Sequence, residues 1–96
     1  MIALADIAQS LGVARPAADM PIFGVSADSR AIAPGFVFVA IPGTRADGMD
    51  YAAAAIAKGA TLIVGERAPQ DSLSPAAFLQ VADARAALSK MAALFY

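Results

Sequence analysis

The sequence predicts a three-layer α/β/α domain built on a small sheet that is mostly parallel or mixed. Two continuous apolar runs, at residues 37–41 and 61–64, are typical of strands that are buried on both faces. A helical pattern separates them, and a strand, helix and strand of this length form a right-handed crossover between parallel strands. Helical patterns near both ends of the chain supply the covering layers, so the predicted order is α-β-β-α-β-β-α.

The first half of the chain predicts one helix and two strands. Apolar residues recur at helical spacing over residues 3–11, and Gly12 follows as a helix stop. Two prolines predict a connector over residues 15–21. Residues 23–27 favour a short strand. The apolar run at 37–41 favours a central one, because it lies between Gly35 and Pro42.

The helix after the central strand begins at a cap formed by Asp47 or Asp50 and runs to about residue 58. Tyr51 shares the apolar side of this predicted helix, which favours a core or interface position. Tyr96 is interpreted in the same way.

The second half continues with a strand at 61–64, a polar loop at 68–75 and a third strand at 77–81. Asp83 then caps the last predicted helix. That helix is still in phase at its final residues and has no closing Gly, Asn or Pro, which predicts that residues 1–96 are the N-terminal piece of a longer polypeptide.

Composition narrows the class of protein. The chain has 96 residues and a formal net charge of −1, which suits one small domain and argues against a nucleic-acid surface. It contains no Cys and no His, so disulfides, thiolate nucleophiles and His-based metal sites are excluded. No basic and apolar leader opens the sequence, and the expected location is the cytoplasm.

Two polar clusters flank the predicted central strand. The first is Asp28-Ser29-Arg30, and the second is the glycine-containing segment 43–48. Hydroxyls, arginines and free backbone N–H groups in both loops would suit one anionic ligand, with Thr44 and Arg45 best placed to reach it. An ordinary strand-to-helix loop is an equally good interpretation of residues 43–48.

Each candidate in the first cluster has two interpretations. The Ser29 hydroxyl can donate to a phosphate or ribose oxygen, or it can bond its own backbone in a turn, which is the commoner role. Arg30 can bind a diphosphate, or it can pair with Asp28 or Asp47 and join the two loops. The pairing role is favoured for Arg30.

Catalytic patterns are missing from the sequence. It contains no His base, no Cys nucleophile and no Gly-x-Ser-x-Gly elbow. The carboxylates of Asp47 and Asp50 are better explained as helix caps. The 96 residues alone are therefore predicted to be non-catalytic and to hold no metal.

Residues 25–66 resemble the N-terminal domain of the Mur ligases, and residues 81–96 extend the resemblance. These are ATP-dependent enzymes that add amino acids to the UDP-linked precursor of peptidoglycan. The similarity is carried by Asp28-Ser29-Arg30, Pro34-Gly35-x-x-Phe38-Val39-Ala40, Gly43-x-x-x-Asp47-Gly48, Ala57-x-Gly59-Ala60 and Phe95-Tyr96.

The resemblance implies a ligase of cell-wall synthesis, which serves cell shape and division. The sequence is most similar to the member that adds the third amino acid to UDP-N-acetylmuramoyl-L-alanyl-D-glutamate. The sister ligase that adds D-alanyl-D-alanine is one alternative, and a non-catalytic interaction module is another. The added amino acid, whether diaminopimelate, lysine or another, is not given. ATP and magnesium would bind a central domain, and the amino acid a C-terminal domain, both outside residues 1–96.

The resemblance also implies site residues. Ala27 and Ser29 would contact the uridine diphosphate from one side, and Thr44, Arg45 and Ala46 would contact it from the other. Arg30 is an additional candidate, since the family pattern keeps it without giving its role. Some relatives have His or Gln at positions 44 and 45, so Thr44 and Arg45 would change the hydrogen bonds in detail.

Overall fold

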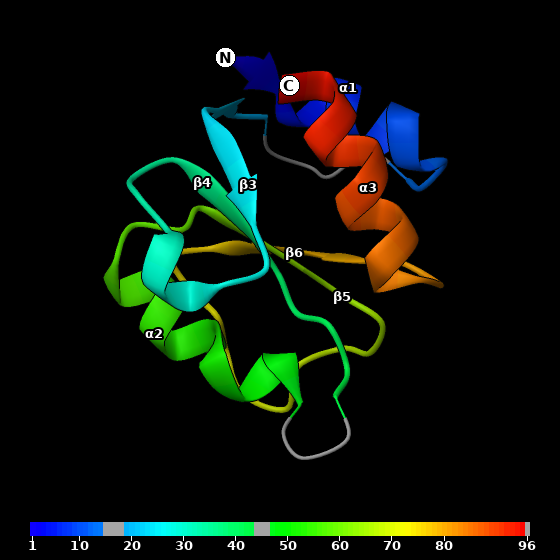
Figure 1. Cartoon of the computed structure of the whole chain (residues 1–96). Helices are drawn as coiled ribbons and strands as arrows, with labels where there is room; N and C mark the ends of the chain where they lie inside the picture. The colour runs from blue at the N-terminus through cyan, green and yellow to red at the C-terminus, as the bar shows by residue number, and fades with distance from the viewer. Residues whose placement is uncertain (15–18, 44–46, 96) are drawn as a thin grey trace.

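The computed structural model describes residues 1–14, 19–43 and 47–95, and its centre is a four-stranded parallel sheet (Figure 1). The strands are β3 (Gly24–Ser26), β4 (Phe36–Val39), β5 (Leu62–Gly65) and β6 (Ala77–Gln80), and they lie side by side in that order. Two further strands, β1 (Ile2–Ala3) and β2 (Pro21–Ile22), form a separate antiparallel pair. The predicted four strands are confirmed. The additional pair was missed because two-residue strands leave no periodic signal.

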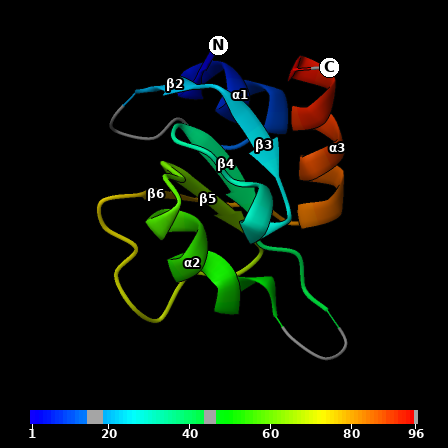
Figure 2. The ribbon, with the colours of Figure 1, turned by 60° about the vertical axis from the view of Figure 1, so that its left-hand side comes forward.

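Helices cover both faces of the sheet (Figures 1 and 2). Helices α1 (Leu4–Leu11) and α3 (Ala84–Phe95) lie on one face, and α2 (Ala52–Ala57) lies on the other. Gly12 ends α1 in the left-handed conformation, with a φ of 70°, as expected for this stop. The three-layer α/β/α prediction is confirmed.

The core is split between the two faces by the alternation of side chains along each strand. On β4, Val37 and Val39 pack toward α1 and α3, whereas Phe38 and the following Ala40 pack toward α2. All four are at most 1% exposed, so this run is buried on both faces as predicted. The sheet therefore has little freedom to shift, and its strand ends are fixed platforms.

Consecutive strands are neighbours and all run parallel, so their carboxyl ends meet at one edge of the sheet. We call this side the carboxyl edge; it comprises residues 27–31, 40–43, 47–51, 66–67 and 81–83. The opposite side is the amino edge; it comprises residues 23, 33–35 and 59–61. Ligands of open parallel sheets bind outside the carboxyl ends of the strands.

Backbone contacts hold the amino edge together. The Gly35 N–H donates to the Gly59 carbonyl at 2.9 Å, and the Phe23 N–H donates to the Gly35 carbonyl at 3.0 Å. Gly59 has a φ of 111°, and a Cβ at this position would lie 2.6 Å from Pro34 Cα. Only glycine fits there, because both the dihedral angle and the space exclude a side chain.

The helix after β4 differs in part from its prediction. Asp47 caps it as expected, but the first turn is a 3₁₀ helix, η2 (Gly48–Tyr51), and α2 begins only at Ala52. Tyr51 is 48% exposed, so of the two positions predicted for it, core or interface, the core position is wrong. Tyr51 lies before the first residue of α2, so the α-helical spacing on which that prediction was based does not apply to it. Tyr96 lies outside the described residues.

The helices in the described ranges are all too short or too polar to cross a membrane.

Candidate functional site

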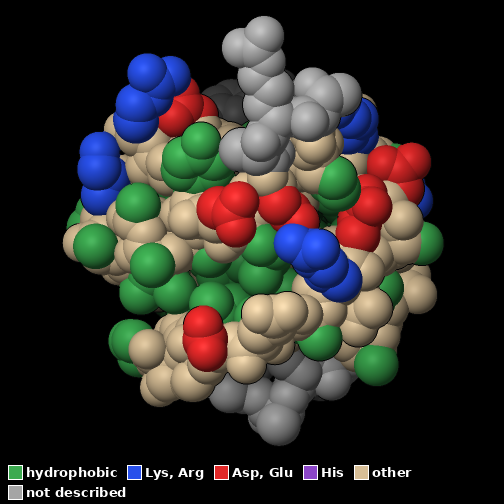
Figure 3. Space-filling model, turned by 90° about the horizontal axis from the view of Figure 1, so that it is seen from below, with side chains coloured by type: hydrophobic (Ala, Val, Ile, Leu, Met, Phe, Trp, Pro, Cys, Tyr) green, Lys and Arg blue, Asp and Glu red, His purple; other side chains and the backbone are tan. Residues whose placement is uncertain are grey.

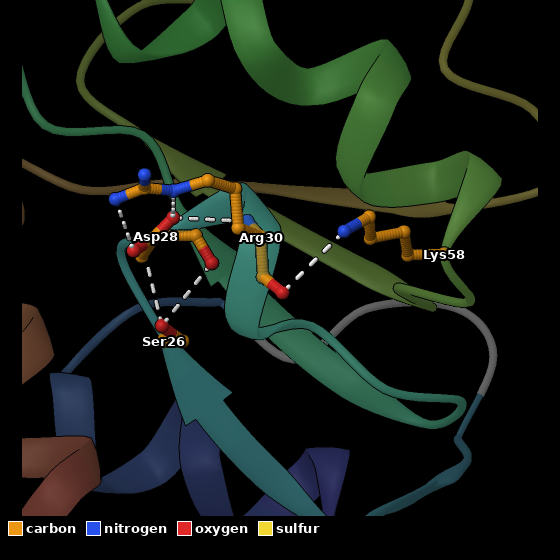
Figure 4. A network of polar contacts seen from close by, with 4 residues as sticks. All are labelled: Ser26, Asp28, Arg30 and Lys58. Atoms are coloured by element: carbon orange, nitrogen blue, oxygen red, sulfur yellow. Dashed lines mark hydrogen bonds and ion pairs between the residues drawn. The ribbon is translucent and has the colours of Figure 1, made fainter.

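The chain turns sharply after β3 and forms a short 3₁₀ helix, η1 (Ser29–Ala31). The Asp28 carboxylate caps it by accepting the Arg30 N–H at 2.9 Å. Ser26 Oγ, at the end of β3, accepts the Asp28 N–H at 3.0 Å and donates to the Asp28 carbonyl at 3.3 Å (Figure 4). Side chains of the turn thus satisfy its own backbone groups and fix its shape.

Arg30 closes the same turn from outside. Its Nε and Nη2 atoms donate to the two carboxylate oxygens of Asp28 at 3.1 and 3.0 Å (Figure 4). These hydrogen bonds lower the pKa of Asp28 and raise that of Arg30. Lys58 Nζ, just after α2, donates to the Arg30 carbonyl at 3.4 Å.

The pairing role predicted for Arg30 is therefore confirmed, with Asp28 as its partner. Asp47 forms an ion pair with Arg67 instead, which follows β5. Arg30 does not join the two loops within the described part of the chain. Its side chain is 86% exposed and stays open to solvent on its outer side.

Ser29 occupies the middle of this turn and is half-buried. In the part of the chain that the structure describes, its hydroxyl has no hydrogen-bond partner. The turn's side-chain hydrogen bonds come from Ser26 and Asp28. The alternative of a turn closed by its own side chains is therefore met by Asp28, whose carboxylate accepts the Arg30 N–H, and not by the Ser29 hydroxyl.

A hollow of about 440 Å³ lies beside this turn; we call it the β3 hollow. One wall comes from the segment after β3, and the other is Tyr51, the last residue of η2, which follows β4. The segments after β3 and β4 therefore meet at one opening. The described residues of the second predicted loop, 43, 47 and 48, do not line it. The lining residues are Ala27, Asp28, Ser29, Arg30 and Tyr51.

Of the predicted contacts, Ala27 and Ser29 line this hollow, together with the additional candidate Arg30. Thr44, Arg45 and Ala46 lie outside the described residues. Tyr51 also lines the hollow, which was not predicted, because its helical spacing favoured a core or interface position. The signal that could have found it is its position directly after the second polar cluster.

The base of the second loop is closed by backbone. Pro42 and Asp47 form an antiparallel bridge, and the Gly48 N–H donates to the Ile41 carbonyl at 3.0 Å. A Cβ on Gly48 would lie 2.4 Å from the Ile41 nitrogen, so glycine permits this close approach. The Asp47 carboxylate accepts the Met49 N–H at 3.0 Å and caps η2.

A second hollow, of about 310 Å³, lies between the ends of β4 and β5 and includes Glu66 and Arg67 in its lining. Seen from below, this side of the molecule has hydrophobic side chains in its middle with acidic and basic ones around them (Figure 3). In residues 1–14, 19–43 and 47–95, no three acidic side chains gather in a way that could hold a metal ion. The carboxyl edge thus offers hollows, hydroxyls and paired charges.

Comparison with known proteins gives one consistent family. Residues 21–96 match the family described as "Mur ligase family, catalytic domain". The chain is 42% identical over 94 residues to the UDP-N-acetylmuramoyl-L-alanyl-D-glutamate--2,6-diaminopimelate ligase of Mesorhizobium japonicum, which covers 97% of this chain and 19% of that protein. The ligase of the same name from Bacteroides fragilis is 42% identical over 78 residues, covering 81% and 16%.

Solved structures agree with the sequence comparison. A crystal structure of MurF from Acinetobacter baumannii superposes with a TM-score of 0.70 at 29% identity, covering 91% of this chain and 19% of that one. MurF from Thermotoga maritima in complex with ADP gives 0.58 at 31% identity, covering 70% and 15%. The chain thus spans about a fifth or less of the length of the proteins that it matches.

Proposed function

Because this chain belongs to the Mur ligase family, we propose that it is the N-terminal, substrate-anchoring domain of an ATP-dependent amide ligase of peptidoglycan synthesis. The whole enzyme adds the third amino acid to UDP-N-acetylmuramoyl-L-alanyl-D-glutamate in the cytoplasm. Residues 1–96 bind the UDP part of this precursor at the carboxyl edge. The remaining domains of the same chain carry the chemistry.

The relatives support this choice within the family. Those from Mesorhizobium japonicum and Bacteroides fragilis are named for adding 2,6-diaminopimelate, and each is 42% identical to this chain. The MurF structures are 29% and 31% identical. The higher sequence identity favours the third-residue ligase over the sister that adds D-alanyl-D-alanine.

The observation that carries the UDP proposal is the β3 hollow. It lies at the carboxyl ends of two adjacent parallel strands, where open α/β sheets bind their ligands. Ala27 and Ser29 contribute to it, and Ser29 is half-buried in a turn that other side chains hold in place. Thr44, Arg45 and Ala46 complete the proposed contacts from the neighbouring loop.

Anchoring the nucleotide contributes to rate without contributing a reacting group. Binding energy from a remote part of the substrate positions the carboxylate that reacts. ATP with magnesium, bound by the central domain, supplies the phosphoryl group that activates that carboxylate. The incoming amine then displaces phosphate.

We expect residues 1–96 alone to bind UDP weakly. Three or four hydrogen bonds, each contributing about 1–3 kcal/mol, offset an association cost of about 4–15 kcal/mol. Affinity in the millimolar range or weaker follows. The remaining domains would add affinity by holding the rest of the precursor.

NMR titration of the ¹⁵N-labelled chain with UDP tests the site. We expect shift changes at residues 27–30 and 47–51, and we expect Ser29→Ala to weaken UDP binding about fivefold, the value of one hydrogen bond. Ser89→Ala is the matched control, because Ser89 is an exposed serine on α3. Shift changes confined to α1 and α3 would refute the site and would favour an interaction module instead.

A further inference from the structure

Tyr51 is a large aromatic side chain that the proposed function has not yet used. It is 48% exposed, and it forms one wall of the β3 hollow opposite the residues that follow β3. Three other large hydrophobic side chains in the described ranges are also exposed, namely Met1, Phe23 and Leu94. None of them lines this hollow. Tyr51 therefore supplies the aromatic surface of the hollow.

The backbone fixes the position of Tyr51. It is the last residue of η2, whose first residue is held against Ile41 by the Gly48 hydrogen bond. The Asp47 carboxylate caps the same 3₁₀ turn, and buried Ala52 anchors the start of α2 directly after it. A ring held on such a short, capped turn loses little conformational freedom when a ligand packs against it.

The charges that line the β3 hollow cancel. The carboxylate of Asp28 and the guanidinium of Arg30 face each other through two hydrogen bonds and form a neutral pair. A diphosphate requires cationic groups that are not already neutralised. An uncharged heterocycle with N–H and C=O groups instead suits a neutral hollow with an aromatic wall, a hydroxyl and a carboxylate.

We propose that the β3 hollow receives the uracil base of the nucleotide and that the ring of Tyr51 stacks on it. The inference rests on the proposed function, in which the chain binds UDP. Stacking on an aromatic side chain is a common way in which proteins hold a base, because every base has a π face. The neutral pair and Ser29 then lie along the edge of the base or its ribose, and the diphosphate leaves the hollow.

Three variants test this proposal by NMR titration with UDP and, separately, with ribose 5-phosphate, which lacks the base. Tyr51→Leu keeps an apolar side chain but removes the ring, and we expect about a tenfold loss of UDP affinity. Its affinity for ribose 5-phosphate should not change. Tyr51→Phe should bind UDP as the unaltered chain does, and so should Phe23→Leu, which removes an equally exposed ring at the amino edge.

A direct contact gives a second readout that does not depend on a variant. We expect nuclear Overhauser effects between the ring protons of Tyr51 and the H5 and H6 protons of uracil in the unaltered chain. Their absence at saturating UDP would overturn the stacking proposal.

The outcomes separate the two proposals. Equal UDP affinity in Tyr51→Leu and the unaltered chain, with shift changes still at residues 27–30, would overturn the role of Tyr51 and leave the UDP site intact. Equal losses for UDP and ribose 5-phosphate would also overturn stacking. Absence of UDP-induced shifts at the hollow in the unaltered chain would refute the UDP site and the role of Tyr51 together.

Discussion

The two edges of the sheet are built in different ways. At the amino edge, backbone groups bond to one another, and glycines allow the chain segments to approach closely, as between Gly59 and Pro34. At the carboxyl edge, acidic side chains accept backbone N–H groups at the start of the next element. Asp28, Asp47, Glu66 and Asp83 all do so.

This difference separates stability from binding. Backbone-to-backbone hydrogen bonds do not depend on which side chains are present. The amino edge can therefore hold the fold, but these bonds offer little to a ligand. Side-chain caps leave other polar groups, such as the Ser29 hydroxyl, without a hydrogen-bond partner among the described residues, and hollows form between them. Changes at the amino edge should therefore alter stability and leave binding unchanged, whereas changes in the β3 hollow should alter binding with only a small effect on stability.

The largest effect that tests this comparison is expected from Gly59→Ala. A Cβ would lie 2.6 Å from Pro34 Cα, and alanine would have to adopt a φ of 111°. We expect a loss of about 3 kcal/mol in the free energy of unfolding, measured with urea. Gly12→Ala is the control, since its φ is 70° but nothing lies within 4 Å, and we expect about 1 kcal/mol.

The folded fraction of Gly59→Ala should bind UDP as the unaltered chain does. A changed pattern of UDP-induced shifts would mean that the two edges are coupled, and the comparison would fail.

A smaller effect is expected from Glu66→Ala at the carboxyl edge. Glu66 Oε2 accepts the Ala84 N–H at 2.8 Å, so the end of β5 caps the first turn of α3. Removing this cap should lower the free energy of unfolding by about 1 kcal/mol. Asp71→Ala is the control, because Asp71 is exposed and caps no helix in the described residues. Equal stability of the two variants would show that Glu66 does not act as a cap.

The smallest effect concerns the ion pair of Asp28 and Arg30. Hydrogen bonds from Arg30 lower the pKa of Asp28 below its ordinary 3.8. A lowered pKa means that the pair stabilises the fold above the ordinary pKa, and that this contribution is lost as the pH falls through the lowered value. We therefore expect an Asp28→Asn variant and the unaltered chain to converge in stability in strong acid.

Following the Asp28 carboxyl carbon by NMR from pH 7 to pH 2 checks this prediction. The midpoint should lie below 3.8 in the unaltered chain and move back toward it in Arg30→Gln. An unchanged midpoint in Arg30→Gln would show that the pair does not form in solution. The effect on stability should be small, because both side chains are largely exposed.

Most of the fold could be predicted because its core elements have strong periodic signals. Residues 37–40 of the predicted run are buried on both faces, and the helical repeat of Leu4, Ile7 and Ala8 is buried as well. Strands β1 and β2 could not be predicted, because tertiary pairing alone defines them. The η2 turn was missed because a 3₁₀ turn and an α-helix share the same capping residues.

The site was only partly predictable. The two polar clusters were found from the sequence, since polar residues that follow buried strands are easy to recognise. The partner of Arg30 was not decided, because Asp28 and Asp47 are equivalent in the sequence until Arg67 is seen to occupy Asp47. Tyr51 is exposed because the 3₁₀ turn η2 ends at this residue, and the spacing of apolar residues does not predict where such a turn ends.

The backbone bridge between Pro42 and Asp47, at the base of the second loop, has a consequence for how the sequences of relatives can differ. Among the described residues, the base of this loop is held by the backbone bridge, by the Gly48 hydrogen bond and by the contacts of Asp47 with Met49 and Arg67. We therefore expect exchanges at residues 44–46 to leave the sheet undisturbed. Doubling the length of a flexible loop costs only about 0.6 kcal/mol in closure entropy. In the proposed function, exchanges such as threonine and arginine at positions 44 and 45 would then alter the contacts with the nucleotide while the scaffold stays the same.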